Sequence, residues 1–180
     1  MNRIELKKHG FVLWMTGLSG SGKTTIADAL CDQLGDSGID YERLDGDVLR
    51  SVFSNTGFSR EARDEHIRRV GFMASRLEYH GVPVVASFIS PYRQTRQFVR
   101  DLCQNFVEVY VKASLDECKR RDVKGLYKKA LAGEIKEFTG IDDPYEAPEH
   151  PEIIVDTEEQ TVKASAKQIM DYIKLHLAGQ

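Results

Sequence analysis

Residues 17–24 read Gly-Leu-Ser-Gly-Ser-Gly-Lys-Thr and match the pattern G-x-x-x-x-G-K-[ST]. This pattern is typical of a P-loop, in which backbone N–H groups and a helix N-terminus attract phosphate. The apolar run at 11–15 predicts a buried strand before it, and residues 25–34 have the apolar spacing of a helix after it. The alternative is a chance match in a glycine-rich turn, but the flanking strand and helix favour nucleoside triphosphate binding.

The P-loop pattern also assigns roles to two side chains. We expect Lys23 to reach the β- and γ-phosphates of ATP and the Thr24 hydroxyl to ligate Mg²⁺. The residues expected to contact ATP are Gly17, Leu18, Ser19, Gly20, Ser21, Gly22, Lys23, Thr24 and Thr25.

The composition is that of a soluble globular protein. The chain has 180 residues, of which 41% are hydrophobic and 29% charged, and this length suits a single domain over residues 1–180. Because the net charge is −3, an anionic nucleotide requires a local cluster of cations, and nothing indicates a nucleic-acid surface.

The cellular location can also be predicted. Met1 to Gly10 lacks the apolar stretch of a signal peptide, and no apolar run is long enough to span a membrane. Cys31, Cys103 and Cys118 are far apart and show no metal-binding spacing. We expect a cytoplasmic protein with reduced, buried cysteines and no membrane partner.

Strand-like and helix-like segments alternate along the chain. The predicted strands are 11–15, 39–44, 84–89, 106–111 and 153–155, and the predicted helices are 25–34, 48–53, 59–80, 91–103, 115–121 and 161–177. This alternation predicts an α/β fold with a five-stranded parallel sheet flanked by helices. Ligands of such sheets bind at the carboxyl ends of the strands.

Residues 122–151 are long for a connection in a compact domain. The segment carries several lysines, and a helix is predicted from Leu126 to about Phe138. A basic insert beside a phosphate site favours a lid that excludes water on closing. A static surface insertion with solvated lysines is the alternative.

A second substrate needs residues outside the P-loop. No guanine-specific N-K-x-D is present, and the strand at 84–89 carries no acidic residue at its end. Asp47 follows the neighbouring strand and could accept the proton of an attacking hydroxyl and hold a metal-bound water. Its alternative role is to cap the helix that begins at Val48.

Two helices are expected to direct polar side chains towards these strand ends. Arg50 lies one turn after Asp47. Arg63 and His66 fall on the apolar stripe of the long helix, so Arg63 should meet a substrate anion or an acid such as Asp47. Phe58 could stack on a base or pack against the helix start.

Taken together, these segments resemble the adenylylsulfate kinase family over nearly the whole chain. The resemblance is carried by the P-loop and by L-D-G-D-V-L-R at 44–50, G-F-S-R at 57–60, I-R-R at 67–69, F-I-S-P-Y-R at 88–93, K-G-L-Y-K-K-A at 124–130 and F-T-G-I-D-D-P-Y-E-A-P at 138–148. The resemblance implies a nucleotide-kinase-like sheet, often in a homodimer. It also implies transfer of the γ-phosphoryl of MgATP to the ribose 3′-hydroxyl of adenylylsulfate.

The resemblance further implies a role for each matching residue. Arg50 and Arg63 would grip the phosphosulfate, Phe58 and Phe138 would enclose the adenine, and Asp47 would assist the 3′-hydroxyl. His66 would also contact this substrate, Ile89 would line its pocket, and Lys124, Gly125 and Leu126 would close over it. Ser90 matches a serine proposed in the family as a phosphoserine intermediate, although in-line transfer needs no such step.

The chain departs from the family pattern at two positions. His66 stands where the family usually has Asn, and Val123 where it usually has Pro.

The sequence leaves two alternatives to this function. One is a kinase for another small hydroxyl compound, and the other is a nucleotide-binding regulatory module without turnover.

Overall fold

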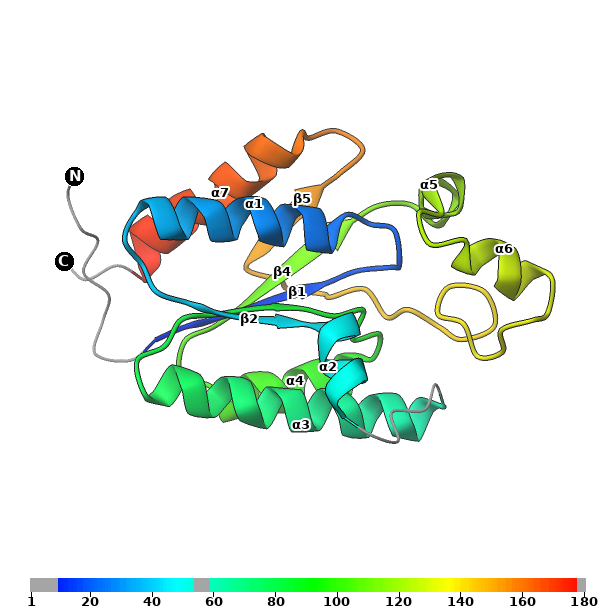
Figure 1. The fold of residues 1–180 in the computed structure, drawn as a ribbon, viewed down its shortest axis with the longest axis horizontal. Helices are drawn as coiled ribbons and strands as arrows, with labels where there is room; N and C mark the ends of the chain where they lie inside the picture. The colour runs from blue at the N-terminus through cyan, green and yellow to red at the C-terminus, as the bar shows by residue number, and fades with distance from the viewer. Residues whose placement is uncertain (1–9, 54–58, 178–180) are drawn as a thin grey trace.

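The computed structural model describes residues 10–53 and 59–177. Its centre is a sheet of five parallel strands in the order β2-β3-β1-β4-β5 (Figure 1). The strands are β1 (Val12–Thr16), β2 (Glu42–Asp45), β3 (Val84–Ser87), β4 (Phe106–Lys112) and β5 (Ile153–Asp156). The predicted five-stranded parallel sheet is therefore confirmed.

Helices cover both faces of this sheet, with α1 and α7 on one face and α3 and α4 on the other (Figure 1). The helices are α1 (Lys23–Asp36), α2 (Gly46–Val52), α3 (Arg60–Tyr79), α4 (Arg93–Leu102), α5 (Leu115–Arg121), α6 (Leu126–Leu131) and α7 (Val162–His176). The hydroxyls of Ser59, Ser114 and Thr161 cap α3, α5 and α7.

The alternation of β1 side chains explains the two layers. Leu13 and Met15 pack in the cluster under α1 and α7, whereas Val12 and Trp14 pack in the cluster under α3 and α4. All four are fully buried, because successive side chains of a strand point to opposite faces and both faces are covered.

The insert between α5 and β5 extends beyond the sheet and carries α6 (Figure 1). The predicted helix was wrong in length, since α6 ends at Leu131 rather than near Phe138. Gly133 and Glu137 have φ of +75° and +55°, so the backbone leaves the right-handed helical region there. The insert has its own apolar cluster, which includes Leu18 of the P-loop.

The second strand begins later than predicted, at Glu42 instead of Ile39. The Ile39 N–H donates to the carbonyl of Leu34 at the end of α1, with Gly38 at φ +71° in between. Ile39 therefore belongs to the turn that ends α1, although its buried side chain is as apolar as that of a strand residue.

Candidate active site

The P-loop wraps the start of α1 with two left-handed glycines. Gly20 has φ of +77° and Gly22, the residue before α1, has φ of +99°. A residue with a Cβ rarely adopts these values, so the backbone needs glycine at both positions, although the P-loop pattern itself fixes only Gly22 of the two. Lys23 and Thr24 follow directly in the first turn of the helix.

Lys23 is turned back onto the P-loop. Its Nζ donates to the carbonyls of Gly17 and Leu18, at 2.8 Å each. Burial lowers the pKa of Lys23 to about 8. The amine thus binds two neutral carbonyls, whereas the sequence predicts that it binds the charged phosphate oxygens of ATP.

Asp45, not Asp47, is the cap of α2. The Asp45 carboxylate accepts from the backbone N–H of Asp47 at 2.9 Å. It also accepts from the hydroxyl of Ser87 at 3.1 Å, because Asp45 and Ser87 are register partners on β2 and β3. The end of β3 carries no acidic residue, but Asp45 at the end of the neighbouring strand β2 places a carboxylate beside it.

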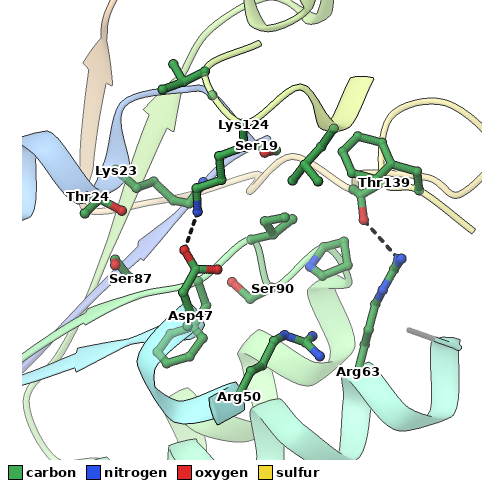
Figure 2. A pocket seen from close by; sticks show the side chains of 18 of the residues that line it. Ser19, Lys23, Thr24, Asp47, Arg50, Arg63, Ser87, Ser90, Lys124 and Thr139 are labelled. Atoms are coloured by element: carbon green, nitrogen blue, oxygen red, sulfur yellow. Dashed lines mark hydrogen bonds and ion pairs between the residues drawn. The ribbon is translucent and has the colours of Figure 1, made fainter. Parts of the chain in front are cut away.

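Because Asp45 caps the helix, the carboxylate of Asp47 is available for other contacts. It forms an ion pair with Lys124 of the insert, shown by a dashed line in Figure 2. The side chains are 72% and 56% exposed, so water screens the pair and it contributes little to stability. The pair matters because of its position, since it connects the insert to α2.

Arg63 points inward from α3, as predicted, but its acid is Asp143 rather than Asp47. Its guanidinium donates to Asp143 Oδ2 at 2.6 Å, to Thr139 Oγ1 at 2.9 Å and to the carbonyl of Glu137. The hydroxyl of Tyr92 donates to the same Asp143 carboxylate at 2.8 Å. Arg63 therefore fastens residues 137–143 of the insert to α3 (Figure 2).

His66 is 2% exposed, and its ring meets Phe53 and Phe88 edge-on. Neither ring nitrogen has a hydrogen-bond partner among residues 10–53 and 59–177. Burial, and then the positive charge of Arg50, lowers the pKa of His66 to about 4. The imidazole is therefore neutral near pH 7.

Ser90 lies in a strained turn after β3, with φ of +37°. Its Oγ accepts from the indole Nε1 of Trp14 at 3.1 Å, and its carbonyl accepts from Arg96 at 2.7 Å. The residue is 2% exposed. These contacts fix the turn that carries Ile89 into the pocket wall.

A cavity of about 970 Å³ joins these elements. Among the predicted site residues, it is lined by Ser19, Gly20, Gly22, Lys23, Thr24, Thr25, Asp47, Arg50, Arg63, His66, Ile89, Ser90, Lys124, Leu126 and Phe138. Four predicted residues do not line it: Gly17, Leu18, Ser21 and Gly125. Phe58 lies outside the described residues.

A second cavity, of about 290 Å³, also borders Gly20 and Gly22 of the P-loop. Arg121 lines it and donates to the Thr157 hydroxyl at 2.9 Å and the Thr157 carbonyl at 3.0 Å. Arg120 and Arg121 both pair with Glu117, at 2.7 Å each, and Arg120 does not line this cavity.

Sequence reasoning missed several residues of the main cavity. Asp45 and Ser87 both end strands, so the carboxyl-end rule could have found them. Tyr127 and Thr139 line the cavity from the insert, and only their place in the family motifs pointed to them.

Comparison with known proteins gives a consistent result. The family model described as adenylylsulphate kinase matches residues 9–156. The chain is 51% identical over 170 residues to the adenylyl-sulfate kinase of Synechococcus sp. (strain JA-3-3Ab), covering 94% of this chain and 97% of that one. It is 54% identical over 166 residues to that of Staphylococcus carnosus (strain TM300), covering 91% and 83%.

Solved structures are similar as well. The Mycobacterium tuberculosis APS kinase in complex with AMPPNP and APS superposes with a TM-score of 0.87 at 38% identity, covering 93% of this chain and 99% of that one. A hexameric APS kinase from Thiobacillus denitrificans gives 0.70 at 32% identity, and the match covers 93% of this chain and 29% of that longer one. The shikimate kinase of Acinetobacter baumannii, at 17% identity and a TM-score of 0.62, shares the fold over 92% of this chain and 94% of that one.

Proposed function

The chain belongs to the adenylylsulphate kinase family, and from this premise we propose how its residues transfer the γ-phosphoryl of ATP to the ribose 3′-hydroxyl of adenylylsulfate. The products are 3′-phosphoadenylylsulfate and ADP. The observation that carries the assignment is one cavity lined by the P-loop on one side and by Asp47, Arg50 and Phe138 on the other.

The P-loop would bind the triphosphate. Its backbone N–H groups and the N-terminus of α1 would cradle the phosphates, and Lys23 would exchange its two carbonyl partners for phosphate oxygens. The second cavity, beside Gly20 and Gly22, would take the adenine of ATP, with Arg121 as the side chain beside it.

The acceptor would lie between α2, α3 and the insert. Phe138 and Phe58 would enclose its adenine, Ile89 would line that pocket, and Arg50 would face the phosphosulfate. Lys124 would close over it, with Gly125 and Leu126 beside it. His66 would border the pocket as a neutral ring, which suits an uncharged part of the substrate.

Asp47 would act as the base. Its carboxylate is 72% exposed and free of capping, so the 3′-hydroxyl of the acceptor can reach it. It would accept the hydroxyl proton as the oxygen attacks the γ-phosphorus in line. Since Lys124 now occupies this carboxylate, acceptor binding would separate the pair.

The donor set at the strand ends suits Mg²⁺, which prefers oxygen ligands and one or two carboxylates together with substrate phosphates. Thr24 and Asp47, the latter through water, would hold it, with Asp45 and Ser87 beside them. Bound there, Mg²⁺ would neutralise charge on the phosphates. Ser90 would shape the turn rather than carry phosphate, because the Trp14 indole already binds its buried hydroxyl.

The function is tested with purified protein, Mg²⁺, γ-labelled ATP and adenylylsulfate, followed by chromatography of the labelled nucleotide. We expect label in 3′-phosphoadenylylsulfate, and none with Lys23→Ala. Shikimate, gluconate and nucleoside monophosphates serve as competing acceptors. Label in one of these, with none in the sulfonucleotide, would overturn the assignment.

For the assembly we propose a homodimer, as the family resemblance implies. Light scattering after size exclusion should give twice the chain mass of 20.4 kDa. We propose the cytoplasm as the location, because a reducing compartment suits three free cysteines.

A further inference from the structure

Tyr127 of α6 lies between the P-loop and Phe138. Its hydroxyl donates to the carbonyl of Ser19 at 3.0 Å. Its ring meets the ring of Phe138 edge-on, with centroids 5.0 Å apart and planes at 81°. We propose that Tyr127 is a positioning residue that couples the nucleotide site to the acceptor site. This inference rests on the function proposed above.

The contact with the P-loop has a defined direction. A carbonyl only accepts, so Tyr127 must be the donor, and burial raises the pKa of its phenol above the usual value, which keeps the proton in place. In a trans peptide the carbonyl of Ser19 and the N–H of Gly20 point in opposite directions. The hydrogen bond therefore fixes the direction of one N–H group of the phosphate-binding loop.

The contact with Phe138 is equally constrained. The backbone N–H of Phe138 donates to Asp142, and the residues on both sides of it, Glu137 and Thr139, accept from Arg63. Phe138 is 8% exposed and Tyr127 2%. Because such closely packed rings cannot move independently, a shift of one displaces the other.

Tyr127 is also held at its backbone. Asp122, at φ +25°, accepts from the N–H groups of Tyr127 and Lys128, at 3.0 Å each. Leu18, Tyr127 and Phe138 belong to the same apolar cluster, which is separate from the two clusters of the sheet. This cluster can therefore shift as a unit when the P-loop changes shape.

Phosphate binding draws the N–H groups of the P-loop towards the anion and moves Lys23 off the carbonyls of Gly17 and Leu18. The peptide held by Tyr127 follows directly after these two. Nucleotide binding thus sets the place of α6 and of the Phe138 ring that lines the acceptor pocket. By linkage, the acceptor must then change nucleotide affinity by the same factor.

The test is Tyr127→Phe, which removes the hydroxyl and keeps the ring. Calorimetry gives the Kd of AMPPNP with and without saturating adenylylsulfate, and the ratio of the two is the coupling factor. For the wild type we expect a factor in the range of about 5–150 that is common for coupled sites. For Tyr127→Phe we expect it to fall at least threefold towards one. Any change in the Kd of AMPPNP alone is divided out, because both Kd values are measured in the same variant.

Tyr172→Phe, on α7, is the matched control and should keep the wild-type factor. Phe138→Leu keeps the hydroxyl and removes the facing ring, so it should reduce the factor as well, and the double variant should lose no more than either single one. A factor in Tyr127→Phe equal to that of the wild type overturns the inference, as does a wild-type factor of one. The proposed function is judged separately, by turnover of the wild type, and failure of the wild type to bind adenylylsulfate would overturn both.

Discussion

At the scale of the residue, the cavity holds acids and bases whose partners come from the chain itself. Asp47 pairs with Lys124, Arg63 with Asp143, and Lys23 with two carbonyls. These charged side chains, all expected to meet substrate, therefore already have partners, and substrate binding exchanges those partners for substrate atoms. Exchanging one partner for another costs less free energy than leaving a buried charge with no partner.

Replacing Asp47 tests its role as a base. Asp47→Asn keeps the size of the side chain but cannot take up the hydroxyl proton, so kcat should fall by roughly 10²- to 10⁴-fold. The Kd of AMPPNP measured without Mg²⁺ should change little, because Asp45 still caps α2. Asp116→Asn, whose side chain is 97% exposed, is the control. An unchanged kcat would limit Asp47 to its pair with Lys124.

His66 should make stability depend on pH. Its folded pKa of about 4 lies below the ordinary value of 6.5, so between these values the unfolded chain binds more protons. Stability is then complete above pH 6.5 and falls as the pH drops towards 4, by about 3 kcal/mol in total.

Urea unfolding between pH 4.5 and 7.5 checks this, with His66→Asn compared with the wild type. The free-energy difference between the two should shift with pH in favour of the variant on acidification. A constant difference between His66→Asn and the wild type would contradict the buried neutral ring.

At the scale of the element, two helical glycines differ in what surrounds them. A Cβ on Gly71 of α3 would overlap the side chain of Val99 on α4, whereas a Cβ on Gly35 of α1 would meet nothing within 4 Å. Gly71 therefore sets how closely α3 and α4 approach. The apolar spacing of α3 could not show this, because the contact depends on the partner helix.

Alanine at these two positions should have opposite effects. We expect Gly71→Ala to destabilise the fold by about 1–3 kcal/mol through overpacking. Gly35→Ala should stabilise it by roughly 0.5–1 kcal/mol through helix propensity. Urea unfolding measures both, and a Gly71→Ala variant as stable as Gly35→Ala would mean that α3 and α4 can separate at no cost.

The elements themselves were largely predictable. Segments with a strong local pattern, such as α3 and β1, were predicted, since apolar spacing is a local property of the sequence. The length of α6 was not, because the left-handed residues Gly133 and Glu137 end it.

At the scale of the whole molecule, the sheet and the insert are stabilised by different apolar clusters. Helix α6 has six residues and packs in the small cluster of the insert. We expect its amides to exchange with solvent through a local opening of lower free energy than those of α1 and α7. Saturating AMPPNP and adenylylsulfate should slow the exchange of α6 more than that of α7.

Hydrogen exchange followed by mass spectrometry makes this comparison within one sample. Equal protection of α6 and α7 without ligand would show that the insert opens only with global unfolding.

Assembly of the site could be predicted only in part. The carboxyl-end rule and the family motifs brought Lys23, Asp47 and Lys124 together. The pairing of Arg63 with Asp143 could not be foreseen, because the two residues are 80 positions apart and no local pattern relates them. The sequence predicted a substrate anion or an acid such as Asp47 as the partner of Arg63, and in the structure that acid is Asp143.

Because Lys23 is buried against the P-loop carbonyls, ATP binding is coupled to the uptake of protons. With a pKa of about 8 for Lys23, a sizeable fraction of the molecules carries a neutral amine in mildly alkaline solution. Phosphate oxygens favour the ammonium form, so these molecules must take up a proton as ATP enters. The heat of loading will then vary with the ionisation enthalpy of the buffer near pH 8, and this variation will fade near pH 6.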